Sequence, residues 1–537
     1  MKIVLSKKIK SLPKHFWILL AIILLGVFLR TYHFSDWLKF NSDQARDASV
    51  VRDMLEKGEL PLLGPVAGGT FFQLGPAFYY FQYAGAKIFG NTPDKLAYAD
   101  LFFGISAILL LYLLARQYFH KNISLVLTVL YACAFFTVQY SRFAWNPNSA
   151  QFFSLLFFYS IVRLWNDQSN RKWLWLVLAG ISLGIGMQLH TLLLFGMPFA
   201  LFVLALYLWK NKRIKFVGIG TIIFVALLLN GTQILSEMKT GGTNYWEFKQ
   251  ALLKKSGNQN PLWKNALFIV SCQAQANIKI LAPQANQENC DFPLADKYFK
   301  RLKSNMQDFS DWLFYGGKII VVALFLVIGY GLMYRKRKKD GDGPAVLLLL
   351  FNLALLFVFV PFGAEISLRY FILLAFVPFL LLGACLEFVL EKCRPRLKFW
   401  MLVGVFSLIA YNVYFCFLTF HAQANNLPGN TVDGTAIQAE AMADYIIEKS
   451  GFAKKIQIGG QKIYVGRFYN RMAYFAKNKG VEMLLLNGSE DVSSENWPIF
   501  VAIDDMSKEC PIGEYYKYGR VKDCQKMYAV SILSIER

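Results

Sequence analysis

The basic residues of this chain are distributed unevenly between its apolar segments. Short linkers rich in Lys and Arg alternate with linkers that contain few of them. Lys and Arg beside membrane-spanning helices stay on the cytoplasmic side of the membrane. The alternation therefore predicts a multi-pass topology, and the linkers that it places inside are 116–121, 163–172, 210–215, 335–339 and 392–398. Every candidate catalytic residue then lies on the outer face, which argues against a cytosolic nucleotide-using enzyme.

The composition agrees with a membrane protein. Of 537 residues 55% are hydrophobic, and the mean hydropathy is +0.37, more than a soluble domain of this size could bury. A net charge of +22 could indicate nucleic-acid binding. However, the tail from residue 421 has 14 basic and 14 acidic residues, so the excess lies in the inner linkers. We therefore expect contact with anionic membrane lipid and no nucleic-acid partner.

The apolar runs predict about 11 transmembrane helices. They cover roughly 15–33, 96–115, 123–141, 148–165, 173–190, 192–209, 214–235, 315–334, 344–362, 367–389 and 399–420. The first run lacks a small-residue cleavage site and is expected to remain as a helix. Residues 74–90 are almost long enough to span, but counting them would reverse the sidedness of every later basic linker. We predict that they form a helix in the outer interface.

The predicted fold is an α-helical polytopic membrane protein with a small C-terminal extracytoplasmic α/β domain. Residues 1–420 form the membrane domain, with long outer loops at 31–95 and 236–314, and residues 421–537 form the soluble domain. The first loop should contain an amphipathic helix from Asp43 to Lys57, and the second is polar and interrupted by Pro261 and Pro283. The tail should contain helices at 434–450 and 466–478 and strands near 456–459, 482–486 and 499–503.

Four of the eight cysteines occur as two pairs in regions predicted to lie outside. Cys272 and Cys290 share the second outer loop, and Cys510 and Cys524 share the tail. This distribution favours two local disulfides in an oxidising compartment. Four free thiols are the alternative, and no metal-binding spacing such as C-x-x-C occurs.

The first outer loop contains two acids four residues apart. On a helix, Asp43 and Asp47 face the same way, with Arg46 close by. Asn41 or Ser42 would cap this helix, and its dipole would favour an ionised Asp43 in the first turn. Such a carboxylate could accept a proton from a hydroxyl group. An ordinary acid-rich helix start on a solvated loop is the alternative, and location beside the first span favours the functional interpretation.

Further candidates lie at the outer ends of other spans. Arg142 could bind an anion or extend along the membrane surface to water, and the neighbouring Asn146 and Asn148 could bind sugar hydroxyls. His190 ends a span and could equally be a structural residue. Arg369 opens an apolar span, where a cation costs about 2.5–3.5 kcal/mol and needs a partner. Glu365 is the structural partner, and a lipid-linked phosphate is the functional one.

These residues together resemble a known family. The acid-bearing first loop, the Ser141-Arg142-Phe143-x-Trp145-x-Pro147 loop, Gln188-Leu189-His190 and Arg369-Tyr370 are similar to the polytopic lipid-phosphosugar-dependent glycosyltransferases of GT-C type. That group includes protein O-mannosyltransferases, aminoarabinose transferases and lipopolysaccharide-core transferases. The resemblance covers residues 1–420 and rests on the order and sidedness of weak motifs.

The resemblance implies inverting sugar transfer from a polyprenyl-phosphate donor to a hydroxyl of a glycan, lipid or protein, at the outer face of the plasma membrane. It implies that Asp43 is the catalytic base and that Asp47 supplies any second acid. The donor phosphate would be bound by Arg369, Arg142 and His190. The substrate contacts would be Arg46, Gln73, Asn146, Asn148 and Tyr370. No cofactor is required, although Asp43 and Asp47 could hold a divalent metal weakly.

The chain departs from the family pattern at three places. Family members often have Asp-Glu where this chain has Asp43-Gln44. Aminoarabinose transferases have a Lys and an acid where this chain has Gly75 and Asn146, each before a proline. These differences argue against aminoarabinose transfer to lipid A. The alternative functions are a polytopic transporter or lipid flippase and a non-catalytic glycan-assembly protein, although internal repeats and midplane charges typical of transporters are not evident.

Overall fold

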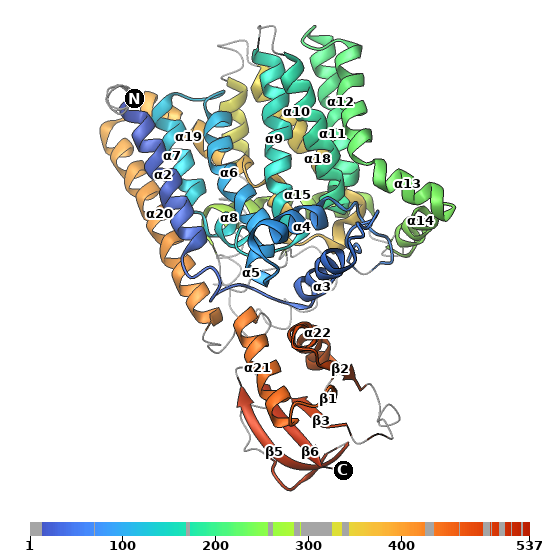
Figure 1. Cartoon of the computed structure of the whole chain (residues 1–537). Helices are drawn as coiled ribbons and strands as arrows, with labels where there is room; N and C mark the ends of the chain where they lie inside the picture. Colours follow the sequence, from blue (N-terminus) through green and yellow to red (C-terminus); the bar gives the residue numbers. More distant parts are fainter. Residues whose placement is uncertain are drawn as a thin grey trace, which may run out of the picture.

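The structure is a computed structural model in which a helical bundle stands above a small α/β unit (Figure 1). It describes residues 13–68, 70–167, 172–255, 261–283, 290, 325–335, 343–424, 434–460, 462–486, 495, 497–503, 511–516, 518–527 and 530–536. The first helix (Lys14–Thr31) begins at the end of the bundle opposite the α/β unit, as the predicted topology requires.

The bundle is built from apolar helices, most of them long. They are α2 (Lys14–Thr31), α6 (Tyr98–Ala115), α7 (Lys121–Cys133), α8 (Phe135–Gln139), α9 (Asn146–Asn166), α10 (Lys172–Leu189), α11 (Thr191–Lys210), α12 (Phe216–Leu229), α18 (Gly343–Phe359), α19 (Val377–Lys392) and α20 (Pro395–Ala424). In the described part of the chain, six helices are long and apolar enough to cross a membrane, or eight if two bent pairs each count as one span. The chain is therefore a multi-pass membrane protein.

Three predicted spans are not single straight helices. The run 214–235 bends by 57° between α12 and α13 (Gly231–Thr240), and the run 367–389 bends by 66° between the 3₁₀ helix η2 (Leu368–Leu374) and α19. A second 3₁₀ helix, η1 (Val360–Glu365), precedes η2. The run 123–141 breaks at Ala134, between α7 and α8. Of the run 315–334, only residues from 325 are described, as a helix over 325–335.

Two polar side chains from other helices stabilise the break at Ala134. Arg30 of α2 is fully buried and donates hydrogen bonds to the Ala132 carbonyl (2.8 Å) and the Thr137 hydroxyl (3.2 Å). Asn412 of α20 accepts a hydrogen bond from the backbone N–H of Phe135 (2.9 Å). Backbone groups freed by a break inside a membrane need such partners. The expectation of one continuous span was wrong because these partners come from distant parts of the chain.

The first predicted outer loop folds across the end of the bundle nearest the α/β unit, which corresponds to the outer end in the predicted topology. It contains α3 (Ser42–Lys57), α4 (Ala77–Phe89) and α5 (Pro93–Leu96), which lie at the end nearest the α/β unit (Figure 1). With 13 residues, α4 is about 20 Å long and cannot span a core of about 30 Å. This agrees with the prediction that residues 74–90 lie in the interface.

The second outer loop is more ordered than its polarity suggests. It contains α13, α14 (Thr243–Lys255) and α15 (Leu262–Leu281), and Pro261 and Pro283 flank α15 as the predicted interruptions. The described part of α15 packs on η1 and η2, so it covers the outer end of the late helices. The predicted disulfide between Cys272 and Cys290 is present.

The tail forms the expected α/β unit. Its helices are α21 (Ala436–Lys449) and α22 (Lys462–Asn478), and its strands are β1 (Lys455–Gly460), β2 (Glu482–Leu485), β3 (Ile499–Ile503), β4 (Tyr515–Tyr516), β5 (Gly519–Met527) and β6 (Val530–Glu536). The sheet order is β2-β1-β3-β6-β5-β4, parallel over β2-β1-β3 and antiparallel beyond. The last three strands were not predicted. Cys524 is disulfide-bonded, and Cys510 lies outside the described residues.

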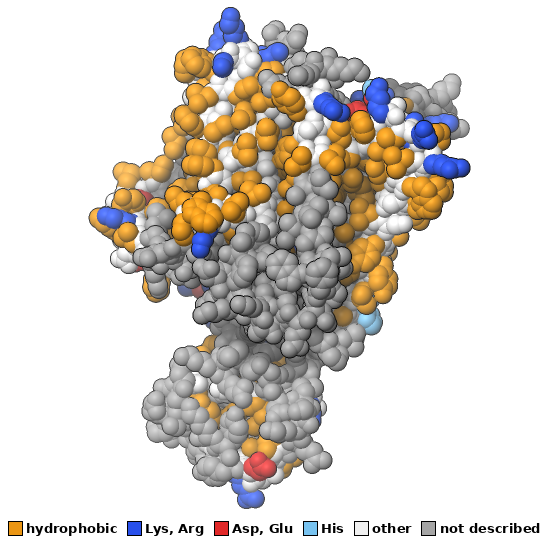
Figure 2. Space-filling view, turned by 180° about the vertical axis from the view of Figure 1, so that it is seen from behind, with side chains coloured by type: hydrophobic (Ala, Val, Ile, Leu, Met, Phe, Trp, Pro, Cys, Tyr) orange, Lys and Arg blue, Asp and Glu red, His pale blue; other side chains and the backbone are white. Residues whose placement is uncertain are grey.

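The surface of the bundle is mostly apolar. Figure 2 shows hydrophobic side chains over the bundle and most Lys and Arg side chains of this face near the end away from the α/β unit. An apolar band with basic residues gathered at one rim is typical of a membrane domain whose cytoplasmic side is that rim.

Candidate active site

The acid-bearing helix α3 begins where the sequence predicts. Asn41 is its N-cap, and the side-chain oxygen of Gln44 accepts a hydrogen bond from the Asn41 backbone N–H (2.9 Å). This pairing fixes the first turn. Asp43 lies in that turn, where the helix dipole stabilises a carboxylate, and its side chain is 57% exposed. The first carboxylate is therefore accessible to an incoming molecule.

Arg46 joins the two carboxylates of α3. Its guanidinium lies 3.0 Å from Asp43 Oδ1 and 2.9 Å from Asp47 Oδ1. Both acids therefore meet one cation, but their surroundings differ, because Asp47 is fully buried. The guanidinium also stands between the two carboxylates, where a shared metal ion would have to lie. In the described part of the chain, the residues whose atoms could share a metal are instead His120, Glu387 and Glu391.

Asp47 is a buried carboxylate with an incomplete set of partners. Tyr79 of α4 donates its hydroxyl to Asp47 Oδ1 (3.1 Å), while Asp47 Oδ2 has no hydrogen-bond partner among the described residues. Burial raises the pKa of Asp47 to about 6, against the opposing effect of Arg46. Burial also raises the pKa of Tyr79, which remains a protonated donor. The charge of Asp47 therefore changes close to neutral pH.

Helix α4 connects this cluster to the outer end of α10. The backbone N–H of Ala77 donates to Gln188 Oε1 (3.1 Å), and Gln188 Nε2 donates to the Leu229 carbonyl (2.9 Å). The approach is close, since a Cβ added to Gly75 would lie 2.3 Å from Cγ of Gln188. A side chain at position 75 would therefore have to displace Gln188. Two residues after Gln188 comes His190.

Arg369 is exposed at the start of η2. Its guanidinium carbon lies 5.8 Å from the centre of the Trp145 ring and 5.5 Å from that of Tyr370. It forms no ion pair with the described side chains, and the side chain of Glu365 lies outside them. An exposed guanidinium beside aromatic faces can bind a planar or tetrahedral anion.

His190 is adjacent to Arg369 and uncharged. Its Nδ1 accepts a hydrogen bond from the Leu192 backbone N–H (3.0 Å), so the ring proton is on Nε2. Burial, with a further contribution from Arg369, lowers the pKa of His190 to about 4. The His190 and Tyr370 rings meet edge to face at 5.4 Å. His190 can therefore donate one neutral hydrogen bond beside the Arg369 charge.

The structure gives Arg142 a different task from phosphate binding. Its guanidinium is buried and donates to the carbonyls of Leu29 (3.0 Å), Tyr32 (2.8 Å) and His33 (3.2 Å). It also lies 4.6 Å from the centre of the Phe420 ring. These bonds hold the end of α2, and a phosphate would have to break them. We therefore leave Arg142 out of the proposed donor site.

The predicted amide contacts also bind backbone. Asn146 donates to the Leu189 carbonyl (2.8 Å), and the buried Asn148 donates to the Phe143 carbonyl (2.6 Å). The backbone of Gln73 exchanges two hydrogen bonds with the Asn244 side chain (2.8 and 3.0 Å). Asn146 thus fixes the segment next to His190. A direct sugar contact by any of these residues stays a prediction.

Three residues to which the sequence analysis gave no role complete the geometry. Tyr79 binds Asp47, Gln188 binds the start of α4, and Trp145 lies under Arg369. Each belongs to a segment that the sequence marked as outer and aromatic or as a span end. Their individual roles depend on contacts between segments far apart in the chain, and a local sequence pattern cannot predict such contacts.

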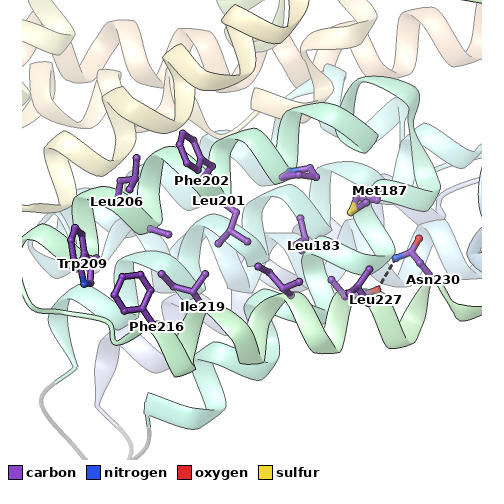
Figure 3. A pocket seen from close by; sticks show the side chains of 14 residues that line it. Leu183, Met187, Leu201, Phe202, Leu206, Trp209, Phe216, Ile219, Leu227 and Asn230 are labelled. Carbon is purple, nitrogen blue, oxygen red and sulfur yellow. Dashed lines mark hydrogen bonds between the residues drawn. The ribbon is translucent and has the colours of Figure 1, made fainter. Parts of the chain in front are cut away.

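An apolar groove of about 580 Å³ opens beside this site. It lies between α10, α11 and α12, and Figure 3 shows its side chains between the two ends marked by Trp209 and Met187. Phe202 and Phe216 are 59% and 69% exposed, so the groove opens on the apolar outer surface of the bundle. Met187 is three residues before His190. The groove therefore reaches the last turn of α10, which precedes His190.

Comparison with known proteins gives both a family match and a fold. A family described as dolichyl-phosphate-mannose-protein mannosyltransferase matches residues 73–230, and no curated protein sequence matches the chain significantly. ArnT from Cupriavidus metallidurans, solved with undecaprenyl phosphate, is similar in structure, with a TM-score of 0.56 at 11% identity over 97% of this chain and 98% of that one. This chain has a GT-C glycosyltransferase fold.

A second GT-C structure agrees. The Archaeoglobus fulgidus oligosaccharyltransferase in its apo form has a TM-score of 0.50 at 14% identity, covering 91% of this chain and 69% of that one. At these identities the similarity concerns the GT-C fold alone. The resemblance inferred from the sequence motifs is thereby confirmed at the level of the fold.

Proposed function

We propose that this protein transfers a sugar from a polyprenyl-phosphate donor to a hydroxyl acceptor at the outer face of the plasma membrane, with inversion. The acceptor is a glycan, a lipid or a protein. The similar fold of ArnT, whose structure was solved with undecaprenyl phosphate, supports this donor class.

One observation carries the proposal. Two polar clusters, one of carboxylates on α3 and one around Arg369, are linked through α4 and Gln188 at the outer end of α10, where an apolar groove begins. A polyprenyl-phosphate sugar has the same three parts: an apolar tail, an anion and a polar ring. The tail fits the groove, the phosphate fits Arg369 and the neutral N–H of His190, and the sugar then faces α3.

The residues support a single-displacement reaction. Asp43 accepts the proton of the acceptor hydroxyl as its oxygen forms a bond to the anomeric carbon. The bond from that carbon to the phosphate oxygen breaks, and polyprenyl phosphate leaves with the electron pair. Arg369 stabilises the charge that develops on the leaving phosphate. One base without a covalent intermediate gives inversion, and Asp47 acts by holding Arg46 and α3.

The disulfides support the outer location. Cys272–Cys290 belongs to the second outer loop, and Cys524 to the α/β unit. Disulfides persist in oxidising compartments. Both outer regions therefore suit the extracytoplasmic side, opposite the basic linkers.

Two substitutions test the proposal in the full chain reconstituted in nanodiscs. Asp43→Asn should bind undecaprenyl phosphate like the unchanged protein and lose transfer by about 10²–10⁴-fold, because it removes a general base. Arg369→Ala should weaken undecaprenyl phosphate binding by about 10- to 100-fold, the value of a charged hydrogen bond. Unchanged transfer in Asp43→Asn would exclude Asp43 as the base. Lipid movement across the bilayer without sugar transfer would instead support a flippase.

A further inference from the structure

The face of α3 away from the bundle contacts the C-terminal α/β unit. Arg52 of α3 donates a hydrogen bond to Asn478 Oδ1 of α22 (2.8 Å), and its guanidinium carbon lies 5.5 Å from the centre of the Tyr474 ring. At the rim, Lys477 Nζ lies 3.8 Å from Asp53. The helix that holds the candidate base is therefore in direct contact with residues more than 400 positions later.

The segment that leads into α3 is also held by this unit. The Phe40 N–H donates to the Gly434 carbonyl (3.0 Å), and the Ala436 N–H donates to the Leu38 carbonyl (3.0 Å). Arg471 of α22 donates to the Phe40 carbonyl (3.3 Å). The Phe40 ring lies 5.5 and 5.6 Å from two aromatic rings of α22, those of Tyr474 and Phe475. Phe40 immediately precedes the N-cap of α3, three residues before Asp43.

Helix α3 is thus held from two sides. Tyr79 of α4 binds Asp47 on the bundle side, and Arg52 binds α22 on the other side. Resting on the function proposed above, we infer that Arg52 and its partners on α22 are positioning residues, which set the place of Asp43 relative to the donor. The C-terminal unit is then a part of the active site's framework rather than a separate module.

The chemistry of Arg52 indicates that it orients α3 and does not only hold α3 and α22 together. Its side chain is only 8% exposed. Its buried Nε has no hydrogen-bond partner and lies 4.0 and 3.9 Å from the carboxylates of Asp53 and Glu56 on the same helix. Burying a guanidinium with incomplete partners is costly, and an apolar side chain of similar length often packs equally well or better. Cohesion alone would therefore be served by methionine. A directed hydrogen bond from Arg52 to Asn478 instead fixes the rotation and height of α3.

The test compares Arg52→Met and Asn478→Ala with the control Lys449→Ala in the full chain in nanodiscs. The control removes an exposed ion pair with Asp523 inside the α/β unit (2.7 Å) and touches neither α3 nor α22 at the interface. Both test variants should keep the undecaprenyl phosphate binding of the control, and Arg52→Met, which leaves no buried charge unpaired, should also keep its thermal midpoint. Their kcat for transfer should fall by about 10- to 100-fold, as expected for a displaced catalytic group. The backbone amides of α3 should exchange hydrogen faster than in the control.

Two results overturn the inference. Transfer within twofold of the control in both variants would show that Arg52 does not position the base. A lower thermal midpoint that accounts for the lost transfer would show a cohesive role only. If the unchanged protein transfers no sugar, the function proposed above fails. Hydrogen exchange of α3 then decides the inference by itself, because unaltered exchange in Arg52→Met would contradict it.

Discussion

Arg46 contacts both carboxylates of α3, and its position depends on the charge of the buried one. An ionised Asp47 holds the guanidinium through a short, charge-assisted contact (2.9 Å) and accepts a hydrogen bond from Tyr79 (3.1 Å). A protonated Asp47 can still contact Arg46, but it loses the electrostatic attraction to the guanidinium. Arg46 would then be held mainly by Asp43, the exposed acid that our mechanism needs as a free base. Asp47 therefore keeps Arg46 from fully neutralising Asp43.

We expect the rate of transfer to fall at low pH because Asp47 becomes protonated, and we call this part of the pH profile the acid limb. Burial raises its pKa from 3.8 to about 6, so Asp47 is ionised above pH 6 and neutral below. The rate should rise with pH through about 6 and then level off. Asp47→Asn should give a low rate without this limb, measured as kcat against pH.

The same pKa direction supplies a control for folding. A raised pKa means that the native state favours the neutral form, so ionisation of Asp47 between about pH 4 and 6 lowers the stability of the fold. At pH 7, Asp47→Asn should therefore unfold at a temperature equal to or higher than that of the unchanged protein. An unaltered acid limb in Asp47→Asn would assign the limb to another group.

At the scale of helices and strands, short sequence patterns correctly predicted the features that depend on contacts within one segment. Asn41 and Gln44 cap α3 at the expected place, and the helices and parallel strands of the tail agree closely with their predicted ranges. The break at Ala134 was missed because its partners, Arg30 and Asn412, come from other helices. The hydrogen bonds of Arg142 were not foreseen for the same reason, since the carbonyls of Leu29, Tyr32 and His33 lie more than 100 residues away in the chain. Sequence spacing locates a cation but not what surrounds it.

Substitutions can test the contact between the start of α4 and Gln188 of α10. A Cβ on Gly75 would lie 2.3 Å from Cγ and 2.6 Å from Oε1 of Gln188. Gly75→Ala must push Gln188 away from the Ala77 N–H and should cost about 1–3 kcal/mol. Gln188→Ala makes room but leaves a buried N–H unpaired, at a similar cost. The double variant should cost less than the sum of the two, by about 0.5–3 kcal/mol.

Unfolding in detergent measures the three free energies. Gly68→Ala is the matched control in the same loop, because an added Cβ there meets nothing within 4 Å. It should leave the free energy of unfolding unchanged. Strictly additive effects of Gly75→Ala and Gln188→Ala would show that the two residues do not compete for one space, and that α4 is held elsewhere.

At the scale of the whole molecule, function depends on which side of the membrane each end of the bundle faces. Helix α3, which carries the two carboxylates, lies at the end of the bundle nearest the α/β unit (Figure 1), and Cys290 of the α15 disulfide contacts Ile366, three residues before Arg369. The basic linkers gather at the other end of the bundle. Because an aqueous acceptor and a lipid-linked donor must meet at the same surface, a reversal of this orientation would move the reaction into the cytoplasm.

Labelling of single cysteines in sealed cells tests the orientation directly. The background is Cys385→Ser with Cys393→Ser, which removes the two free cysteines of the described residues that are not buried. Glu59→Cys, exposed in the first outer loop, should react with a membrane-impermeant maleimide in intact cells. Lys215→Cys, exposed in a basic linker, should react only after permeabilisation. Neither position belongs to the candidate site, so the outcome does not depend on catalysis. The reverse pattern would place α3 and Asp43 inside, and an outer-face transferase would no longer be tenable.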